Sequence, residues 1–197
     1  GALVQLPFAV DTRQRLGQPE FCGRIRSLRD SGMVDYEAVW ALKNEALRML
    51  FAEFETAQGR QADAARQRFG RFAAEGGSLL RGFALFEAVD GVHGAKDGEP
   101  GWLSWPQAFH DPQGAAVQTF AREHESSIRF HMWLQWLCGI QLDEVAKTAA
   151  AHGVRCGLYG DLAVGAARGG ADTWLDRAGH CMEASVGAPP DPLGPLG

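Results

Sequence analysis

The segment VRCGLYGD, residues 154–161, decides the fold that the sequence predicts. Its first six residues have the composition of a short β-strand, and they directly follow a long helical pattern. A single strand leaves its backbone N–H and C=O groups without partners, so it must pair with another extended segment. Residues 3–10 are the only other candidate strand in the sequence. We therefore expect residues 154–161 to belong to a larger sheet, of which this chain is one piece.

The rest of the sequence upstream is predicted to be helical. Apolar residues recur at spacings of three and four, and Asp35 is placed to cap the longest early helix. Gly59, the Gly76–Gly77 pair and Gly153 are expected to end helices. The predicted helices cover residues 19–29, 35–58, 62–74, 78–89 and 111–152, the last with Asp111 as cap and a break near Ser126. This pattern divides the chain into a helical part, 1–152, and a strand with its loop, 153–197.

Composition excludes several classes of protein. The 197 residues carry a net charge of −5, and the 19 basic residues are scattered, so a nucleic-acid partner is not expected. Charged residues interrupt the apolar stretches well before the roughly 20 residues of a membrane helix. The N-terminus has no basic segment and no Met, and we interpret it as the interior of a longer chain.

No metal or cofactor motif is present. The six histidines lack metal-ligand spacing, since His124 and His131, on one predicted helix, are seven residues apart. The four cysteines form no CxxC pair, and we interpret them as small buried residues in a reducing cytoplasm. We therefore expect neither a metal nor a cofactor.

Asp161 is the first candidate functional residue. In a barrel of parallel strands the active site lies at the carboxyl ends of the strands, where an acidic side chain indicates chemistry. Alternatively, Asp161 only caps the turn that follows Gly160, as Asp does in many loops. The spacing leaves both interpretations open.

Three motifs resemble one enzyme family. They are YGDLAVG at 159–165, GADTW at 170–174 and SVGAPPDPLGP at 185–195. At this spacing they are similar to the third barrel strand and the mobile active-site loop of amylomaltases, the 4-α-glucanotransferases of the α-amylase clan. Residues 84–87, 105–106 and 130–136 resemble the helical insertion that precedes that strand. The resemblance covers nearly the whole chain and is weakest in residues 1–15 and 60–77.

The resemblance implies an α/β fold, namely a fragment of a (β/α)8 TIM barrel that is mostly helical insertion. It also implies transfer of α-1,4-glucan segments between maltooligosaccharides through a covalent glycosyl-enzyme, with retention of configuration. Asp161 matches a supporting carboxylate of the family. The nucleophile and the acid/base are expected beyond Gly197, so this piece alone should be inactive. A cytoplasmic protein that uses no cofactor is implied.

Further residues are assigned through the same resemblance. Asp172, Pro190 and Asp191 match positions that contact the glucan, although loop rigidity alone would also explain them. The sequence departs from the family pattern at Ala163, where many members have Pro, and at 192–193, where many have aromatic residues. These departures put sugar stacking by the loop in doubt.

The sequence also permits other functions and an association between copies of the chain. The chain could instead be a stand-alone helical glucan-binding or regulatory module, or belong to another glycosidase of the α-amylase clan. A truncated barrel would leave one face exposed, through which homo-oligomers could form. Trp133 and Trp136 lie on a helical stripe typical of a core, whereas Trp102 and Trp105 lie in a loop, where sugar contact stays open.

Overall fold

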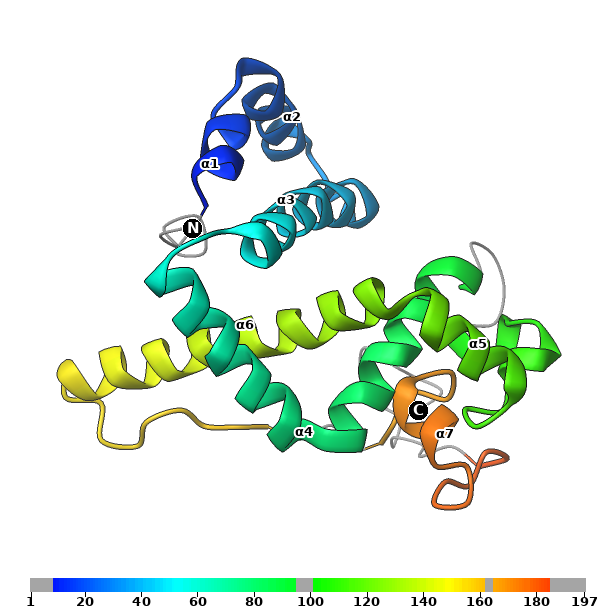
Figure 1. Ribbon diagram of the computed structural model, residues 1–197. Coiled ribbons are helices and arrows are strands. Elements are labelled where there is room, and N and C mark those ends of the chain that lie inside the picture. The colour runs from blue at the N-terminus through cyan, green and yellow to red at the C-terminus, as the bar shows by residue number, and fades with distance from the viewer. Residues whose placement is uncertain (1–8, 95–100, 162–164, 185–197) are drawn as a thin grey trace, which may run out of the picture. The chain divides into compact units, whose positions relative to one another are not determined.

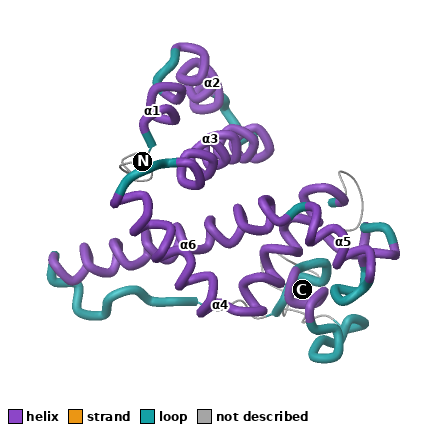
Figure 2. The backbone as a smooth tube through the Cα atoms, viewed as in Figure 1, coloured by secondary structure: helices purple, strands orange, loops and turns teal. Residues whose placement is uncertain are grey.

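The fold is helical. The computed structural model describes residues 9–94, 101–161 and 165–184, and every regular element within these ranges is an α-helix or a 3-10 helix (Figures 1 and 2). The chain divides into two compact units, which we call the N-terminal unit, Gly1–Glu75, and the C-terminal unit, Gly76–Gly197. The predicted boundary between residues 152 and 153 lies inside the second of them.

The predicted strand at 154–159 is wrong. The chain leaves α6 (Glu125–Ala151) through Gly153, at φ 78°, and continues in turns and irregular backbone in which every residue from 154 to 161 is exposed. Residues 3–8 of the expected pairing segment lie outside the described ranges, and Val10 begins α1 (Val10–Leu16). The described residues contain no extended partner with which 154–161 could form a sheet. The Val154 N–H donates instead to the carbonyl of Ala149 at 3.0 Å, in the last turn of α6. The expected α/β barrel fragment is therefore replaced by an all-helical one.

The N-terminal unit consists of α1, α2 (Pro19–Asp30), α3 (Tyr36–Thr56) and the first part of α4 (Arg60–His93). Asp35 caps α3 as predicted, because its Oδ1 accepts a hydrogen bond of 2.9 Å from Ala38 N. The helix α1 was not predicted. Its first turn is bound by Glu53 of α3, whose carboxylate oxygens accept from Asp11 N and Thr12 N at 2.7 and 3.2 Å. A carboxylate at a helix N-terminus is stabilised by the helix dipole.

The core of this unit lies between α3 and α4. The rings of Phe54 and Phe69, both fully buried, meet edge to face with centroids 5.7 Å apart. The guanidinium of Arg66 donates to the carbonyls of Phe54 and Ala57 at 2.9 and 2.7 Å. These carbonyls are at the end of α3, where helical partners run out, so Arg66 satisfies them from the following helix.

The predicted break at Gly76–Gly77 is confirmed. Gly77 interrupts α4 with φ 52° and ψ −139°, a conformation far from the helical region that only glycine adopts readily. Gly77 also lies at the boundary between the two compact units.

The C-terminal unit contains the rest of α4, the 3-10 helices η2 (Gly101–Ser104) and η3 (Gln107–Phe109), α5 (Ala115–Glu123), α6 and the short α7 (Ala171–Leu175). The predicted helix start at Asp111 is wrong. Its side chain accepts from Gln113 N at 2.9 Å and closes a turn, and α5 begins after Gly114. The predicted break near Ser126 occurs two residues earlier, at His124.

The apolar stripe of α6 is buried over only half its length. Ile128 and Leu137 are buried as predicted, and so are Trp133 and Trp136. Leu142 and Val145, predicted to continue the stripe, are 58% and 50% exposed. The periodicity therefore identifies the apolar face of α6, but it does not show where the contacts of that face end.

Candidate functional site

Asp161 lies at the exposed end of the irregular segment that follows α6. Within the described part of the chain its carboxylate makes no hydrogen bond and no ion pair, and residues 162–164, which a turn cap would engage, lie outside that part. Asp172 is the other predicted site residue within the described ranges, and no hydrogen bond joins it to Asp161 there. Pro190 and Asp191 lie outside the described residues.

Asp172 is on the surface of α7. It occupies the first turn of this short helix and is exposed, whereas Thr173 and Trp174 beside it are buried. The indole N–H of Trp174 donates to the carbonyl of Phe109 at 2.9 Å. Two buried neighbours thus anchor the helix that presents Asp172 to solvent.

Trp102 holds the segment around α7 in place. Its backbone N–H donates to the carbonyl of Gly169 at 3.2 Å, and its Nε1–H donates to Thr173 Oγ1 at 3.0 Å. The guanidinium of Arg177 lies 4.2 Å from the centre of the Trp102 ring, a cation–π contact, and also donates to the carbonyl of His110. Trp102 therefore contacts three separate points between residues 169 and 177, one through its backbone N–H and two through its indole.

A glycine makes this approach possible. Gly101 has φ 61°, and a Cβ added there would lie 1.8 Å from the carbonyl oxygen of Gly169. Any side chain at position 101 would displace residues 169 and 170.

The loop tryptophans belong to the core. Trp102 and Trp105 are 5% and 3% exposed, so neither offers a ring face to a sugar. Trp105 Nε1 donates to Asp90 Oδ1 at 3.0 Å, and its ring meets that of Trp174 edge to face at 5.4 Å. The structure therefore shows both loop tryptophans packed in the core, and not placed to contact a sugar.

A hollow of about 280 Å³ lies beside α7, on the segment that follows Asp161. Arg168, Thr173 and His180 provide polar groups to its lining, with Met182 among the apolar ones. His180 is held by its own turn, in which Nδ1 bonds to the carbonyl of Asp176 at 2.7 Å. Sequence reasoning missed Arg168 and His180, because neither lies in a motif and only the folded loop brings them together.

Two carboxylates of the C-terminal unit have pKa values shifted from the ordinary value. Burial, and then the neighbouring Asp90 carboxylate, raise the pKa of Glu87, whose Oε2 lies 3.9 Å from His131 Nδ1. The hydrogen bond from Arg81, at 2.7 Å, is the main cause that lowers the pKa of Glu125. Glu87 lies on α4 and Glu125 is the first residue of α6, and neither was predicted as a site residue.

Three further features concern the cysteines, the metal-binding side chains and the length of apolar helices. All four cysteines are free, but Cys138, Cys156 and Cys181 are exposed, so the prediction that they are buried is wrong. Over the ranges that the structure describes, no three His, Cys, Asp or Glu side chains are grouped to hold a metal ion. Over the same ranges, no helix is both long and apolar enough to span a membrane.

Comparison with known sequences shows the family. The pattern of the 4-alpha-glucanotransferase family matches residues 3–197. The 4-alpha-glucanotransferase of Haemophilus influenzae is 38% identical over 178 aligned positions, and the alignment covers 88% of this chain and 26% of that protein. That of Mycobacterium tuberculosis is 30% identical over 183 residues, 89% of this chain and 24% of that protein. That of Thermus thermophilus is 28% identical over 199 aligned positions, and the alignment covers 94% of this chain and 36% of that protein.

The chain thus spans between 24% and 36% of the length of these relatives. The match to the family pattern nevertheless extends over nearly every residue and includes the three motifs around Asp161, Asp172 and Asp191. The chain belongs to the 4-alpha-glucanotransferase family.

Proposed function

We propose that this chain is part of an enzyme that transfers α-1,4-glucan segments between maltooligosaccharides. The observation that carries the proposal is the family match over residues 3–197, together with 38% identity to a protein named 4-alpha-glucanotransferase. The reaction proceeds with retention of configuration through a covalent glycosyl-enzyme, which requires a nucleophilic carboxylate and an acid/base carboxylate about 5–5.5 Å apart. Both are assigned to the part of the longer protein outside this chain.

Asp161 is proposed as the carboxylate that supports this pair. Its carboxylate is exposed and therefore accessible to a substrate or to another part of the protein, and it lies within the family match over residues 3–197. An ionised carboxylate beside the donor sugar stabilises the positive charge that develops on the ring in the transition state.

In this proposal, residues 153–197 contact the substrate. The helical part, residues 1–152, holds them in position. Asp172, Pro190 and Asp191 are the proposed contacts. Arg168 and His180 of the hollow are added because guanidinium and imidazole N–H groups can donate to sugar hydroxyls. The bonds from Trp102 to residues 169 and 173 support this division, since they fix the loop on the helical body.

The compartment and assembly are also proposals. A cytoplasmic enzyme fits the four free cysteines, since disulfides are rare in reducing compartments. Homo-oligomers are proposed through the exposed apolar face of α6 and the segment after it, where Leu142 and Tyr159 are 58% and 97% exposed.

The function is tested with the longer protein and with this chain alone. The longer protein incubated with maltotriose should release glucose and form longer maltooligosaccharides, whereas this chain should do neither. Sustained turnover by this chain would show that it contains the nucleophile. Saturable binding of maltoheptaose by this chain, with no transfer by the longer protein, would favour the glucan-binding module instead.

Asp161→Asn in the longer protein tests the supporting carboxylate. We expect its kcat to fall by at least about 100-fold, because the neutral amide no longer stabilises the transition-state charge. Asp143→Asn, which also neutralises an exposed carboxylate, is the matched control and should keep the wild-type rate. Equal rates for both variants would reduce Asp161 to a turn residue.

A further inference from the structure

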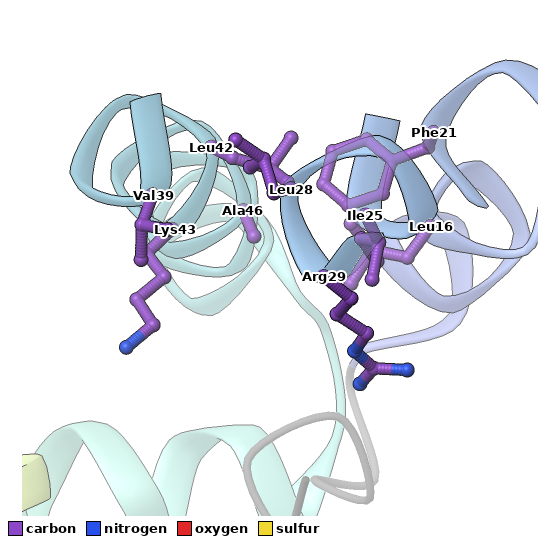
Figure 3. A pocket seen from close by; sticks show the side chains of 9 residues that line it. All are labelled: Leu16, Phe21, Ile25, Leu28, Arg29, Val39, Leu42, Lys43 and Ala46. Carbon is purple, nitrogen blue, oxygen red and sulfur yellow. The ribbon is translucent and has the colours of Figure 1, made fainter. Parts of the chain in front are cut away.

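An apolar hollow of the N-terminal unit lies between its first three helices. It measures about 380 Å³, within the range of roughly 300–1,000 Å³ typical of small-molecule sites. Leu16 of α1, Ile25 and Leu28 of α2, and Val39 and Ala46 of α3 line it (Figure 3). Each of these five side chains is only half-buried, so the groove is an apolar surface that water still reaches.

The chemistry of this groove does not suit a glucan. A sugar needs several hydrogen-bonding groups and, commonly, an exposed aromatic face. Of the residues that line the groove, only Arg29 and Lys43 carry polar side chains, and Phe21, the aromatic residue, is 8% exposed. The groove is therefore suited to an apolar chain, whose transfer from water gains roughly 25 cal/mol per Å² of buried apolar area.

Two cations define one side of the groove. Arg29 extends from α2 and Lys43 from α3, and Figure 3 shows both leaving the apolar lining toward the same side. Both side chains are exposed, and within the described ranges neither forms an ion pair. Arg24, on the same helix as Arg29, by contrast pairs with Glu45 at 2.8 Å. The groove thus combines an apolar lining with two positive charges that have no partner there.

We propose that this groove binds a carboxylate with a long apolar chain, such as a medium-chain fatty acid. The chain lies between α2 and α3 against Ile25, Val39 and Ala46, and the carboxylate lies on the side of Arg29 and Lys43. This arrangement satisfies both features of the groove, since the apolar lining is covered and the cations receive a negative partner. The site is independent of the proposed glucan chemistry, because every residue that lines it lies in the N-terminal unit.

The test uses three ligands with one chain length and three head groups. Decanoate, 1-decanol and decyltrimethylammonium are titrated separately into the 197-residue chain, below the concentration at which each forms micelles. We expect decanoate to bind most tightly and the cation most weakly. Arg29→Gln and Lys43→Gln should each weaken decanoate binding about threefold and together about tenfold, as for exposed ion pairs, with no change for decanol. Arg26→Gln, an exposed arginine of α2 outside the lining, is the matched control and should bind as the wild type does.

Isoleucine methyl NMR locates the ligand. The sequence has three isoleucines, Ile25 in the groove, Ile128 in the buried core and Ile140 exposed on α6. Decanoate should shift the Ile25 methyl signal saturably and leave Ile140 unchanged, and Ala46→Phe, which fills the groove, should abolish the shift. Shifts of Ile140 at the same concentration would show general adsorption to apolar surface. That result, equal affinity for the three head groups, or unchanged binding by Ala46→Phe would each overturn the proposal.

Discussion

Trp102 Nε1 donates a hydrogen bond of 3.0 Å to the hydroxyl of Thr173, 71 residues further along the chain. The same hydroxyl donates to the carbonyl of Arg168 at 2.9 Å, so one oxygen joins η2, α7 and the loop before α7. Both side chains are buried, which makes the loss of either partner costly. This bond fixes the helix on which Asp172 lies.

Thr173→Val is predicted to destabilise the C-terminal unit by about 1–3 kcal/mol, because the valine leaves the buried indole N–H of Trp102 without an acceptor. Urea unfolding followed by tryptophan fluorescence measures the change. Thr148→Val makes the same substitution at an exposed position of α6 and should stay within about 0.5 kcal/mol of wild type. Equal stability of the two variants would show that the bond from Trp102 contributes nothing.

Local signals predicted the helix ends well. Asp35 caps α3, Gly77 breaks α4 and Gly153 ends α6 in the left-handed conformation, each at its predicted position. Such signals depend on neighbours within a few residues, which the sequence shows directly.

Features that depend on distant contacts were not predicted. Residues 154–161 have strand-like composition, but β-propensity expresses packing against neighbouring strands, and the described chain provides none. The short helix α7 was assigned to a loop, since its five residues are too few for a periodic pattern. Its stability comes from Trp102 and from the Phe109 carbonyl bound by Trp174, both far away in sequence.

Gly77→Ala and Gly70→Ala are predicted to change stability in opposite directions. Gly77 has φ 52° and ψ −139°, which an alanine reaches only with strain, and we expect a loss of about 1–3 kcal/mol. Gly70 lies in the regular part of α4, with open space at its Cβ position, so alanine there should gain about 0.5–1 kcal/mol. Thermal unfolding by circular dichroism measures both. A gain at Gly77 would mean that α4 runs straight in solution.

The effect of Glu87→Gln on the stability of the folded protein is predicted to become more favourable as pH rises. The raised pKa of Glu87 means that the folded protein binds its proton more tightly than the unfolded chain does. Stability is therefore lost as pH rises from the ordinary value of about 4.3 through the raised pKa, and the glutamine variant avoids this loss. Urea unfolding at about pH 3.5 and about pH 7.5 should show the variant gaining stability relative to wild type at the higher pH.

Glu125→Gln is predicted to show the reverse pH dependence. Because Arg81 lowers the pKa of Glu125, the ion pair stabilises the folded protein above the ordinary pKa and is lost as pH falls through the lowered one. The variant should be less stable than wild type at about pH 7.5, by less than about 1 kcal/mol since both side chains are half exposed, and should approach wild type in acid. The same pH slope in Glu87→Gln and Glu125→Gln would contradict both assignments.

Asp172→Asn in the longer protein is predicted to raise the KM for maltotriose several-fold and to change kcat less. This split is expected if Asp172 binds the glucan equally in the ground state and the transition state, because uniform binding affects KM alone. The carboxylate is exposed, while Thr173 and Trp174 beside it carry the bonds that hold α7. The substitution should therefore leave the stability of the protein within about 0.5 kcal/mol of wild type. A loss of stability with unchanged KM would instead show that Asp172 only orders its own loop.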